Sequence, residues 1–148
     1  NSMLTNFLTN EKLLKMLIIH DLAEVAIGDI PAFEVSERKN NKHEMEAAAM
    51  KRICETLGEQ GDAFFALWQE GEAKETYEAK VANAIDKLEA QLQHNEAGVH
   101  TWLPIEHEMT FRLDQHTQFD ETLEALRAVI VDEAIDKMKQ ANSPYIAK

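Results

Sequence analysis

The amino-acid sequence predicts an all-α protein, a helical bundle of roughly five to six helices. At 148 residues the chain is the length of one ordinary domain, and its 45% hydrophobic residues can fill a single core. Five Gly and three Pro leave little turn chemistry, while Ala, Leu, Glu, Lys and Met are abundant and favour helices. No alternating strand pattern stands out. We therefore expect one domain over residues 1–148.

The first predicted helix runs from residue 10 to about residue 27, with Asn10 as its N-cap. Its apolar residues cover nearly the whole circumference, which is typical of a central helix. The side that we expect to be buried contains Leu14, Leu17, Ile18, Leu22 and Val25. Gly28 and Pro31 are expected to end this helix, with Asp29 between them in a loop.

Three further helices are predicted in the middle of the chain. One runs from near Ser36 to Leu57, and two glycines close it. A short helix follows through Phe64 to Trp68 and is broken by Gly71. A long helix then spans about residues 76–97. Its apolar stripe consists of Val81, Ile85, Leu88 and Leu92.

The last third of the chain is expected to be less regular. Residues 98–117 show no clean period, and we predict irregular structure with one short helix there. The final helix begins after Asp120 and ends before Ser143 and Pro144. The sequence assigns no functional role to residues 98–148.

The charge balance limits the partners of the protein. With 15 Lys and Arg against 27 Asp and Glu, the formal charge is −12, and such a surface repels a polyanion. We therefore expect no binding to a nucleic acid polymer, whereas a small phosphate ester could still bind beside a cation that neutralises it locally, and the acidity points toward a metal. The apolar stretches fall short of the roughly 18 residues that span a bilayer, so we expect neither a membrane segment nor a signal peptide. The single Cys54, predicted to be buried, fits a cytoplasmic protein, and a homodimer is left open.

Three polar side chains interrupt the apolar pattern of the first helix: His20, Asp21 and Glu24. An isolated buried charge costs on the order of several kcal/mol, so such groups are paired or bind a metal. Their spacing of three and four residues lets all three converge on one spot. Asp86 lies on another predicted helix with an alanine one turn to either side, which would let a second helix approach closely.

These residues suggest a metal site, although a histidine paired with a carboxylate in a core is the alternative. An imidazole with two carboxylates is a ligand set for a divalent ion such as Mn, Fe, Co, Ni or Mg. A structural zinc site would instead be rich in thiolates. We expect the other five histidines to lie at the surface. They are His43, His94, His100, His107 and His116.

The segment Lys15–Ile30 resembles the second motif of HD-domain phosphohydrolases, and it is most similar to their 5'-deoxynucleotidase-like branch. The motif combines an apolar helix, His-Asp, two residues, Glu and then Gly-Asp, and all of these are present. The likeness continues through Glu46–Met50, Leu67–Glu70 and Ala84–Glu89. It covers about residues 10–95.

The resemblance implies a role for each matching residue. His20, Asp21 and Asp86 would be metal ligands, Glu24 a catalytic acid or base, and Asp29 a substrate contact. It also implies an HD-domain helical bundle, a divalent metal cofactor and the hydrolysis of a small phosphomonoester, such as a (deoxy)nucleoside 5'-monophosphate.

One part of the family pattern is missing from the chain. HD domains use a further ligand His on an earlier helix, but residues 1–19 contain no histidine. We expect an N-terminal helix carrying this His to precede residue 1. The alternatives are a degenerate HD bundle that serves as a regulatory or dimerisation module, and an all-α nucleoside triphosphate pyrophosphatase, against which the His20-Asp21 pair speaks.

Overall fold

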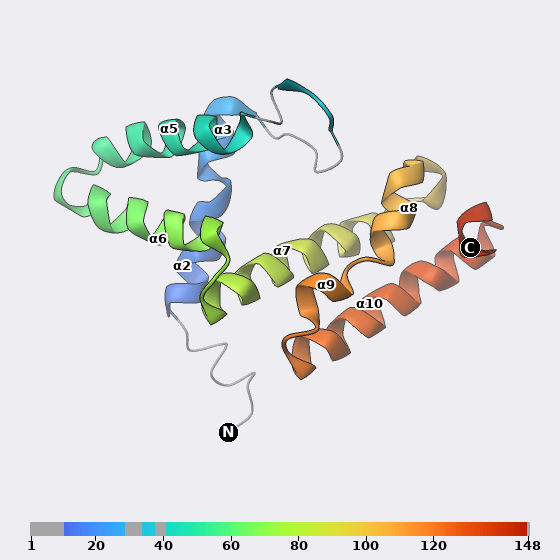
Figure 1. Ribbon diagram of the computed structural model, residues 1–148. Helices are drawn as coiled ribbons and strands as arrows, with labels where there is room; N and C mark the ends of the chain where they lie inside the picture. Colours follow the sequence, from blue (N-terminus) through green and yellow to red (C-terminus); the bar gives the residue numbers. More distant parts are fainter. Residues whose placement is uncertain (1–10, 29–33, 38–40, 148) are drawn as a thin grey trace. The chain divides into compact units, whose positions relative to one another are not determined.

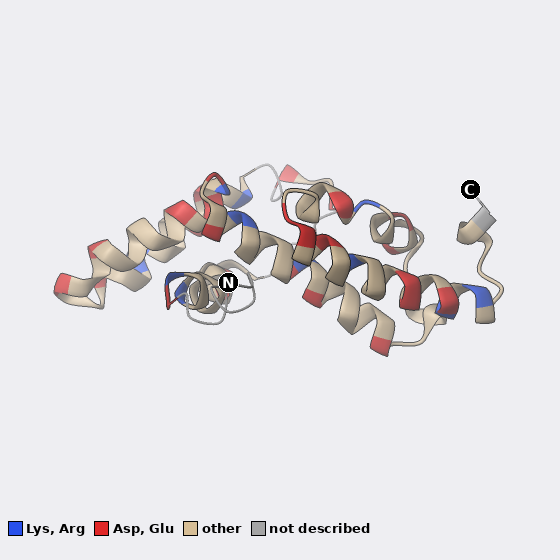
Figure 2. Ribbon diagram, turned by 90° about the horizontal axis from the view of Figure 1, so that it is seen from below, with Lys and Arg blue, Asp and Glu red and all other residues tan. Residues whose placement is uncertain are grey.

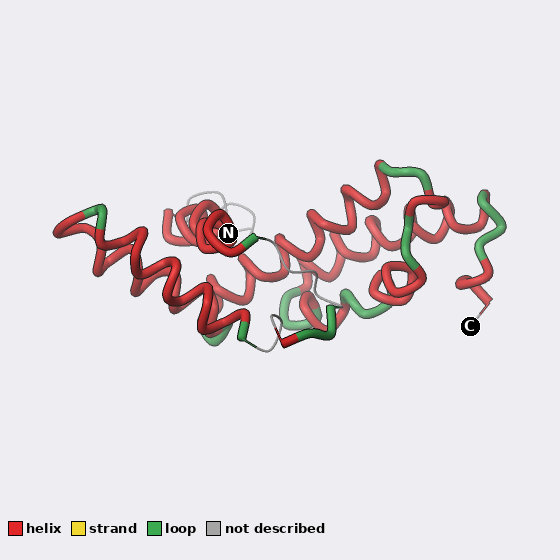
Figure 3. The backbone as a smooth tube through the Cα atoms, turned by 90° about the horizontal axis from the view of Figure 1, so that it is seen from above, coloured by secondary structure: helices red, strands yellow, loops and turns green. Residues whose placement is uncertain are grey.

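The computed structural model describes residues 11–28, 34–37 and 41–147. These residues form helices joined by loops, with no strand among them, which confirms the all-α class (Figures 1 and 3). Two compact units can be distinguished, an N-terminal unit of Thr9–Ala82 and a C-terminal unit that contains Asn83–Lys148. The single domain over residues 1–148 stays a prediction. Within the described ranges, no helix combines the length and the apolar character needed to cross a bilayer.

The N-terminal unit begins with one helical stretch that changes its pitch. Its parts are α2 (Glu11–Ile19), the 3₁₀ turn η1 (His20–Ala23) and α3 (Glu24–Ile27). Gly28 ends the stretch as predicted, with a φ of 78° that favours glycine, and its N–H donates to the Glu24 carbonyl at 2.7 Å. Asn10, Asp29 and Pro31 lie outside the described residues.

A helical hairpin of α5 (Lys42–Glu55) and α6 (Gly61–Ala73) packs against α2 and η1 (Figure 1). The short η2 (Gly58–Gln60) joins the two helices. The apolar core of this unit contains Ile19, Ala23, Met50, Cys54 and Trp68. The predicted burial of Cys54 is thus confirmed.

The hairpin is tight because residue 61 has no side chain. A Cβ at Gly61 would lie 2.2 Å from the Cys54 carbonyl oxygen, so any larger residue would push α5 and α6 apart. The predicted break at Gly71 is wrong, since α6 continues through it to Ala73 and is capped by Lys74, whose φ is 54°. A glycine in a helix is unfavourable, but it does not end the helix when tertiary packing holds both sides.

The buried side predicted for the first helix is wrong for three of its residues. Leu14, Ile18 and Val25 are exposed, Ile18 by 73% and Val25 by 82%. The buried side instead contains Leu13, Met16, Ile19 and Ala23. The apolar pattern covers all faces, so the spacing alone could not choose between them, and the 3₁₀ turn changes the period from 3.6 to about 3 residues after Ile19.

The C-terminal unit consists of long helices with short turns between them. The described part of the unit starts at Asn83, within α7 (Tyr77–Glu96). Its further elements are η3 (Val99–Thr101), α8 (Pro104–Thr110), α9 (Asp114–Thr117), α10 (Glu121–Gln140) and η4 (Pro144–Ala147). The long helices α7 and α10 confirm the two that the sequence predicts. Asp120 caps α10, because its carboxylate accepts from Thr122 N at 2.9 Å and Leu123 N at 3.0 Å. Residues 98–117 are more helical than predicted.

Neutral polar side chains lie buried between α7, α8 and α10. The Asn95 amide donates to the Ile130 carbonyl at 2.9 Å and accepts from Gln91 Nε2 at 3.0 Å. The Gln91 carbonyl in turn accepts from the Thr110 hydroxyl at 2.9 Å. These groups form a hydrogen-bonded network within a core that also includes Trp102, Ala134 and Met138.

Candidate active site and metal centre

His20 lies at the start of η1, where the turn fixes the orientation of its ring. Its Nδ1 is 2.9 Å from the Leu17 carbonyl oxygen. A carbonyl oxygen only accepts, so Nδ1 carries the hydrogen, and Nε2 is left to face Asp21 Oδ1 at 3.1 Å. A lone pair and a carboxylate oxygen this close repel each other, and either a proton on Nε2 or a metal ion between them removes the repulsion. The pair therefore fits a divalent metal, with the carbonyl holding the tautomer that metal-binding histidines use.

The His20-Asp21 pair is accessible from solvent. The His20 side chain is about one-third exposed, and the Asp21 side chain is 69% exposed. The expected burial of Asp21 is therefore wrong, because its side chain projects from the exposed side of η1, whereas Ala23 of the same turn lies in the core. An exposed carboxylate costs little to keep ionised, and a small substrate can reach it.

Glu24 follows one turn later, at the start of α3, and is paired with a lysine from α5. Lys42 Nζ donates to Glu24 Oε1 at 2.9 Å and lies 3.2 Å from Glu46 Oε1. Glu46 is one turn from Lys42 on α5 and only 7% exposed. One cation thus joins two carboxylates in a partly buried position.

Burial and charge act in opposite directions on these groups. Burial raises the pKa of Glu46, with small contributions from Glu72 and Glu24, and Lys42 only partly offsets it. Burial alone would lower the pKa of Lys42, but the hydrogen bonds to Glu24 and Glu46 raise it overall. Lys42 consequently stays charged, and Glu46 binds a proton more readily than an exposed glutamate does.

Glu46 also belongs to a group that could hold a metal ion. One ligand atom each from His43, Glu46 and Glu72 lies within 4.8 Å of the others. The His43 ring stacks on Trp68, with 6.3 Å between ring centroids. This group differs from the predicted ligand set and shares Glu46 with Lys42, whose ammonium lies 3.2 Å from that carboxylate.

Glu46 is indicated by the sequence only as part of a segment that resembles the family, and sequence reasoning missed Lys42 and Glu72. The helical spacing of four residues indicates that Lys42 can pair with Glu46, but it gives no signal for the contact of Lys42 with Glu24. Glu72 lies in a run of acidic residues on α6, and nothing in its spacing separates it from Glu70.

Asp86 belongs to the C-terminal unit, whereas His20, Asp21 and Glu24 belong to the N-terminal one. The Asp86 carboxylate is partly exposed and lies 2.6 Å from Lys87 Nζ. Asp29 lies outside the described residues. The convergence of His20, Asp21 and Asp86 on one metal therefore stays a prediction.

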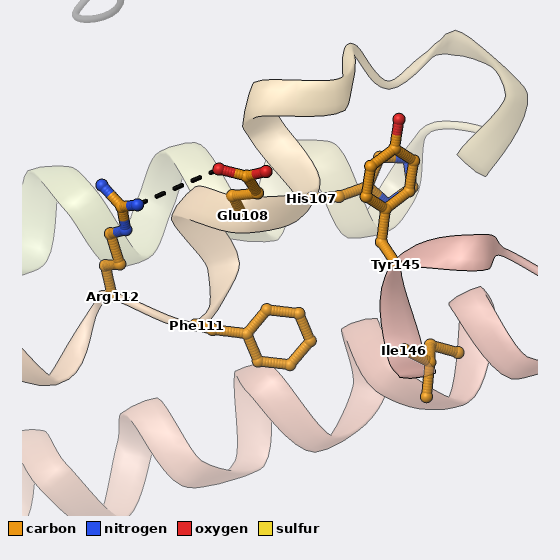
Figure 4. Close-up of a pocket in the computed structure, with 6 residues that line it drawn as sticks. All are labelled: His107, Glu108, Phe111, Arg112, Tyr145 and Ile146. Carbon is orange, nitrogen blue, oxygen red and sulfur yellow. Dashed lines mark ion pairs between the residues drawn. The ribbon is translucent and has the colours of Figure 1, made fainter. Parts of the chain in front are cut away.

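The C-terminal unit contains a shallow pocket of about 270 Å³, shown in Figure 4. Its lining residues are His107, Glu108, Phe111, Arg112, Tyr145 and Ile146. His107 stacks on Tyr145, with 4.5 Å between ring centroids, and is buried, so its predicted surface position is wrong. Burial lowers the pKa of His107, which favours the neutral ring. None of the predicted site residues lines this pocket.

Comparison with known families decides the class of the protein. The model of the HD domain family matches residues 2–127, which is most of the chain. The chain belongs to the HD domain family. The His20-Asp21 pair of η1 lies within the matched residues.

Curated relatives of this HD domain are similar over 55% to 60% of the chain. The 5'-deoxynucleotidase HDDC2 of Dictyostelium discoideum is 40% identical over 83 residues, which cover 55% of this chain and 43% of that protein. The 5'-deoxynucleotidase HDDC2 of Homo sapiens is 35% identical over 91 residues, covering 60% of this chain and 44% of that protein. The chain thus spans less than half the length of these relatives.

A solved structure supports the same assignment. The crystal structure of a predicted metal-dependent phosphohydrolase from Magnetospirillum magnetotacticum is similar with a TM-score of 0.68 and 31% identity. The similarity covers 85% of this chain and 64% of that one. The fold of the HD domain described here is therefore shared with that protein.

Proposed function

We propose that this HD domain is the core of a metal-dependent phosphohydrolase that cleaves a small phosphomonoester, a (deoxy)nucleoside 5'-monophosphate. The observation that carries the proposal is the His20-Asp21 pair, whose Nε2 and Oδ1 atoms face each other at 3.1 Å, as two ligand atoms of one ion do, with Glu24 in the next turn. The similarity to proteins named 5'-deoxynucleotidase supports the choice of substrate.

His20, Asp21 and Asp86 would hold the divalent ion, and Asp29 would contact the substrate. When bound, such an ion polarises a phosphoryl oxygen and lowers the pKa of a coordinated water. It also offsets the repulsion between a phosphate and a protein of charge −12 (Figure 2). We propose Mn, Co, Mg, Fe or Ni as the ion, since imidazole and carboxylate ligands accept all of them.

Glu24 would handle the proton. As the oxygen of the attacking water bonds to phosphorus, Glu24 takes a proton from that water. The bond between phosphorus and the ester oxygen breaks, and the same proton passes to the departing oxygen. One ester and one water thereby give one alcohol and one phosphate.

The experiment compares ligand and proton-transfer variants of the full-length protein. Asp86→Ala is expected to lose both metal and phosphatase activity. Glu24→Ala is expected to keep its metal and to lose turnover by on the order of 10²-fold. Metal content and the rate of nucleoside monophosphate hydrolysis are measured on the same samples, with Glu44→Ala, an exposed acid on α5, as the matched control.

Two results would overturn the proposal. Turnover of Glu24→Ala at the parental rate would remove its catalytic role. A parent protein that hydrolyses no monophosphate with Mn, Co or Mg would favour the regulatory or dimerisation module instead.

A further inference from the structure

Glu24 has a specific partner on the neighbouring helix. Lys42 Nζ, from the first turn of α5, donates to Glu24 Oε1 at 2.9 Å, and the two side chains are each about one-quarter exposed. Among the described residues, Oε2 of Glu24 has no hydrogen bond or ion pair. Oε1 of this carboxylate is thus held by Lys42, while Oε2 is available to accept a proton.

Lys42 is itself fixed in place. Its ammonium lies 3.2 Å from Oε1 of Glu46, whose side chain is nine-tenths buried. A lysine normally samples many rotamers, but contacts with two carboxylates favour the rotamer that makes both of them. Glu46 therefore anchors Lys42 within α5, and Lys42 transmits that position to Glu24 at the start of α3.

We propose that Lys42 is a positioning residue for the hydrolytic reaction, which orients the Glu24 carboxylate through Oε1 and keeps Oε2 turned toward the attacking water. Lys42 can have this role only if Glu24 handles the proton, so the inference rests on the proposed function. Lys42 itself does not touch the substrate. It acts by holding a proton acceptor in one geometry, on which the rate of general base catalysis depends.

The test replaces Lys42 in the full-length protein with Mn²⁺ bound and a nucleoside monophosphate as substrate. Lys42→Met removes the ammonium but keeps most of the stem, and it is expected to lower kcat by about 10-fold to 10²-fold while KM changes by less than about 3-fold. Lys42→Arg, which can still donate to Glu24, is expected to regain most of kcat. Metal content should match the parent in both.

Lys12→Met is the matched control, because Lys12 forms an ion pair of the same kind with Glu70 in the same unit, 2.6 Å apart. It is expected to leave kcat and KM unchanged. A double variant, Glu24→Gln with Lys42→Met, completes the comparison. If Lys42 acts through Glu24, the double variant is no slower than Glu24→Gln alone.

The outcomes separate the inference from the proposed function. If Glu24→Gln is inactive but Lys42→Met keeps the parental kcat, or if the two losses multiply, the role of Lys42 is overturned and the proposed function stands. Loss of metal in Lys42→Met would also overturn the positioning role of Lys42, since a residue that only orients Glu24 does not hold the ion. A parent without turnover, or a fully active Glu24→Gln, contradicts the proposed function and removes the role of Lys42 with it.

Discussion

The two units of the HD domain treat their buried polar groups differently. In the N-terminal unit the partly buried polar residues are charged, with Lys42 between Glu24 and Glu46. In the C-terminal unit the buried polar residues include the neutral Gln91, Asn95 and Thr110, which bond to one another and to the Ile130 carbonyl, while Asn95 also donates to the Glu133 carboxylate at 3.2 Å. The buried acid Asp120 lies at the N-terminus of α10, where backbone N–H groups stabilise its charge.

The difference teaches what each set of residues is for. A satisfied neutral network makes one packing arrangement preferable at little cost in solvation. A buried charge cluster costs more to desolvate than an apolar replacement, so it is kept where its charge is used. We therefore expect the neutral network of Gln91, Asn95 and Thr110 to determine stability, and the charged cluster around Lys42 to determine turnover. Each of the following substitutions tests one side of that division.

The largest effect on stability is expected at Asn95. Asn95→Ala removes the acceptor of Gln91 Nε2 and leaves a small cavity, so the free energy of unfolding should fall by roughly 2–4 kcal/mol. Turnover per folded molecule should not change. Gln93→Ala is the control, because Gln93 makes an exposed amide hydrogen bond to Glu89 on the same helix, and it should cost less than about 0.5 kcal/mol. A loss of kcat in folded Asn95→Ala would break the division.

A smaller effect is expected at the start of α10. Asp120→Ala removes the cap of Thr122 N and Leu123 N, and should lower the free energy of unfolding by about 1–2 kcal/mol. Asp120→Asn keeps an acceptor at the cap and should recover most of this loss. Urea denaturation of the three proteins measures the difference. Equal stability of Asp120→Ala and the parent would contradict the role of the cap.

The smallest effect concerns the pH dependence of stability in the N-terminal unit. The pKa of Glu46 is raised in the folded protein, so its stabilising contribution is complete below the ordinary value of 4.5 and is lost as pH rises through the folded value. Glu46→Gln cannot titrate, and the decline in unfolding free energy above pH 4.5 should become shallower in it. Urea denaturation at a series of pH values checks this. Parallel curves for the two proteins would show that burial of Glu46 does not oppose its ionisation.

Much of the fold could be predicted because the decisive signals are local. Gly28 ends its helix by a φ that other residues avoid, and Asp120 starts α10 by a side-chain hydrogen bond two and three residues away. The signal that decides which face of the first helix is buried is not local in sequence. Leu14 and Ile18 are as apolar as Leu13 and Met16, and only the packing of α5 and α6 selects which of them is covered.

The candidate site was predictable to the same extent. His20, Asp21 and Glu24 stand out because they are polar in an apolar helix. Lys42 does not, since a lysine at the start of a helix is ordinary, and its importance comes from the 2.9 Å contact with a residue 18 positions away in sequence. A pattern within one helix cannot contain a contact between two helices.

The absence of a side chain at residue 61 has a consequence for transplanting this site. Glu46 and Glu72 lie on opposite arms of the hairpin, and their distance depends on how closely the arms approach. A methyl group at Gly61 would meet the Cys54 carbonyl and open the hairpin. Any design that grafts the charged cluster onto another pair of helices must therefore copy this glycine, although it touches none of the charges.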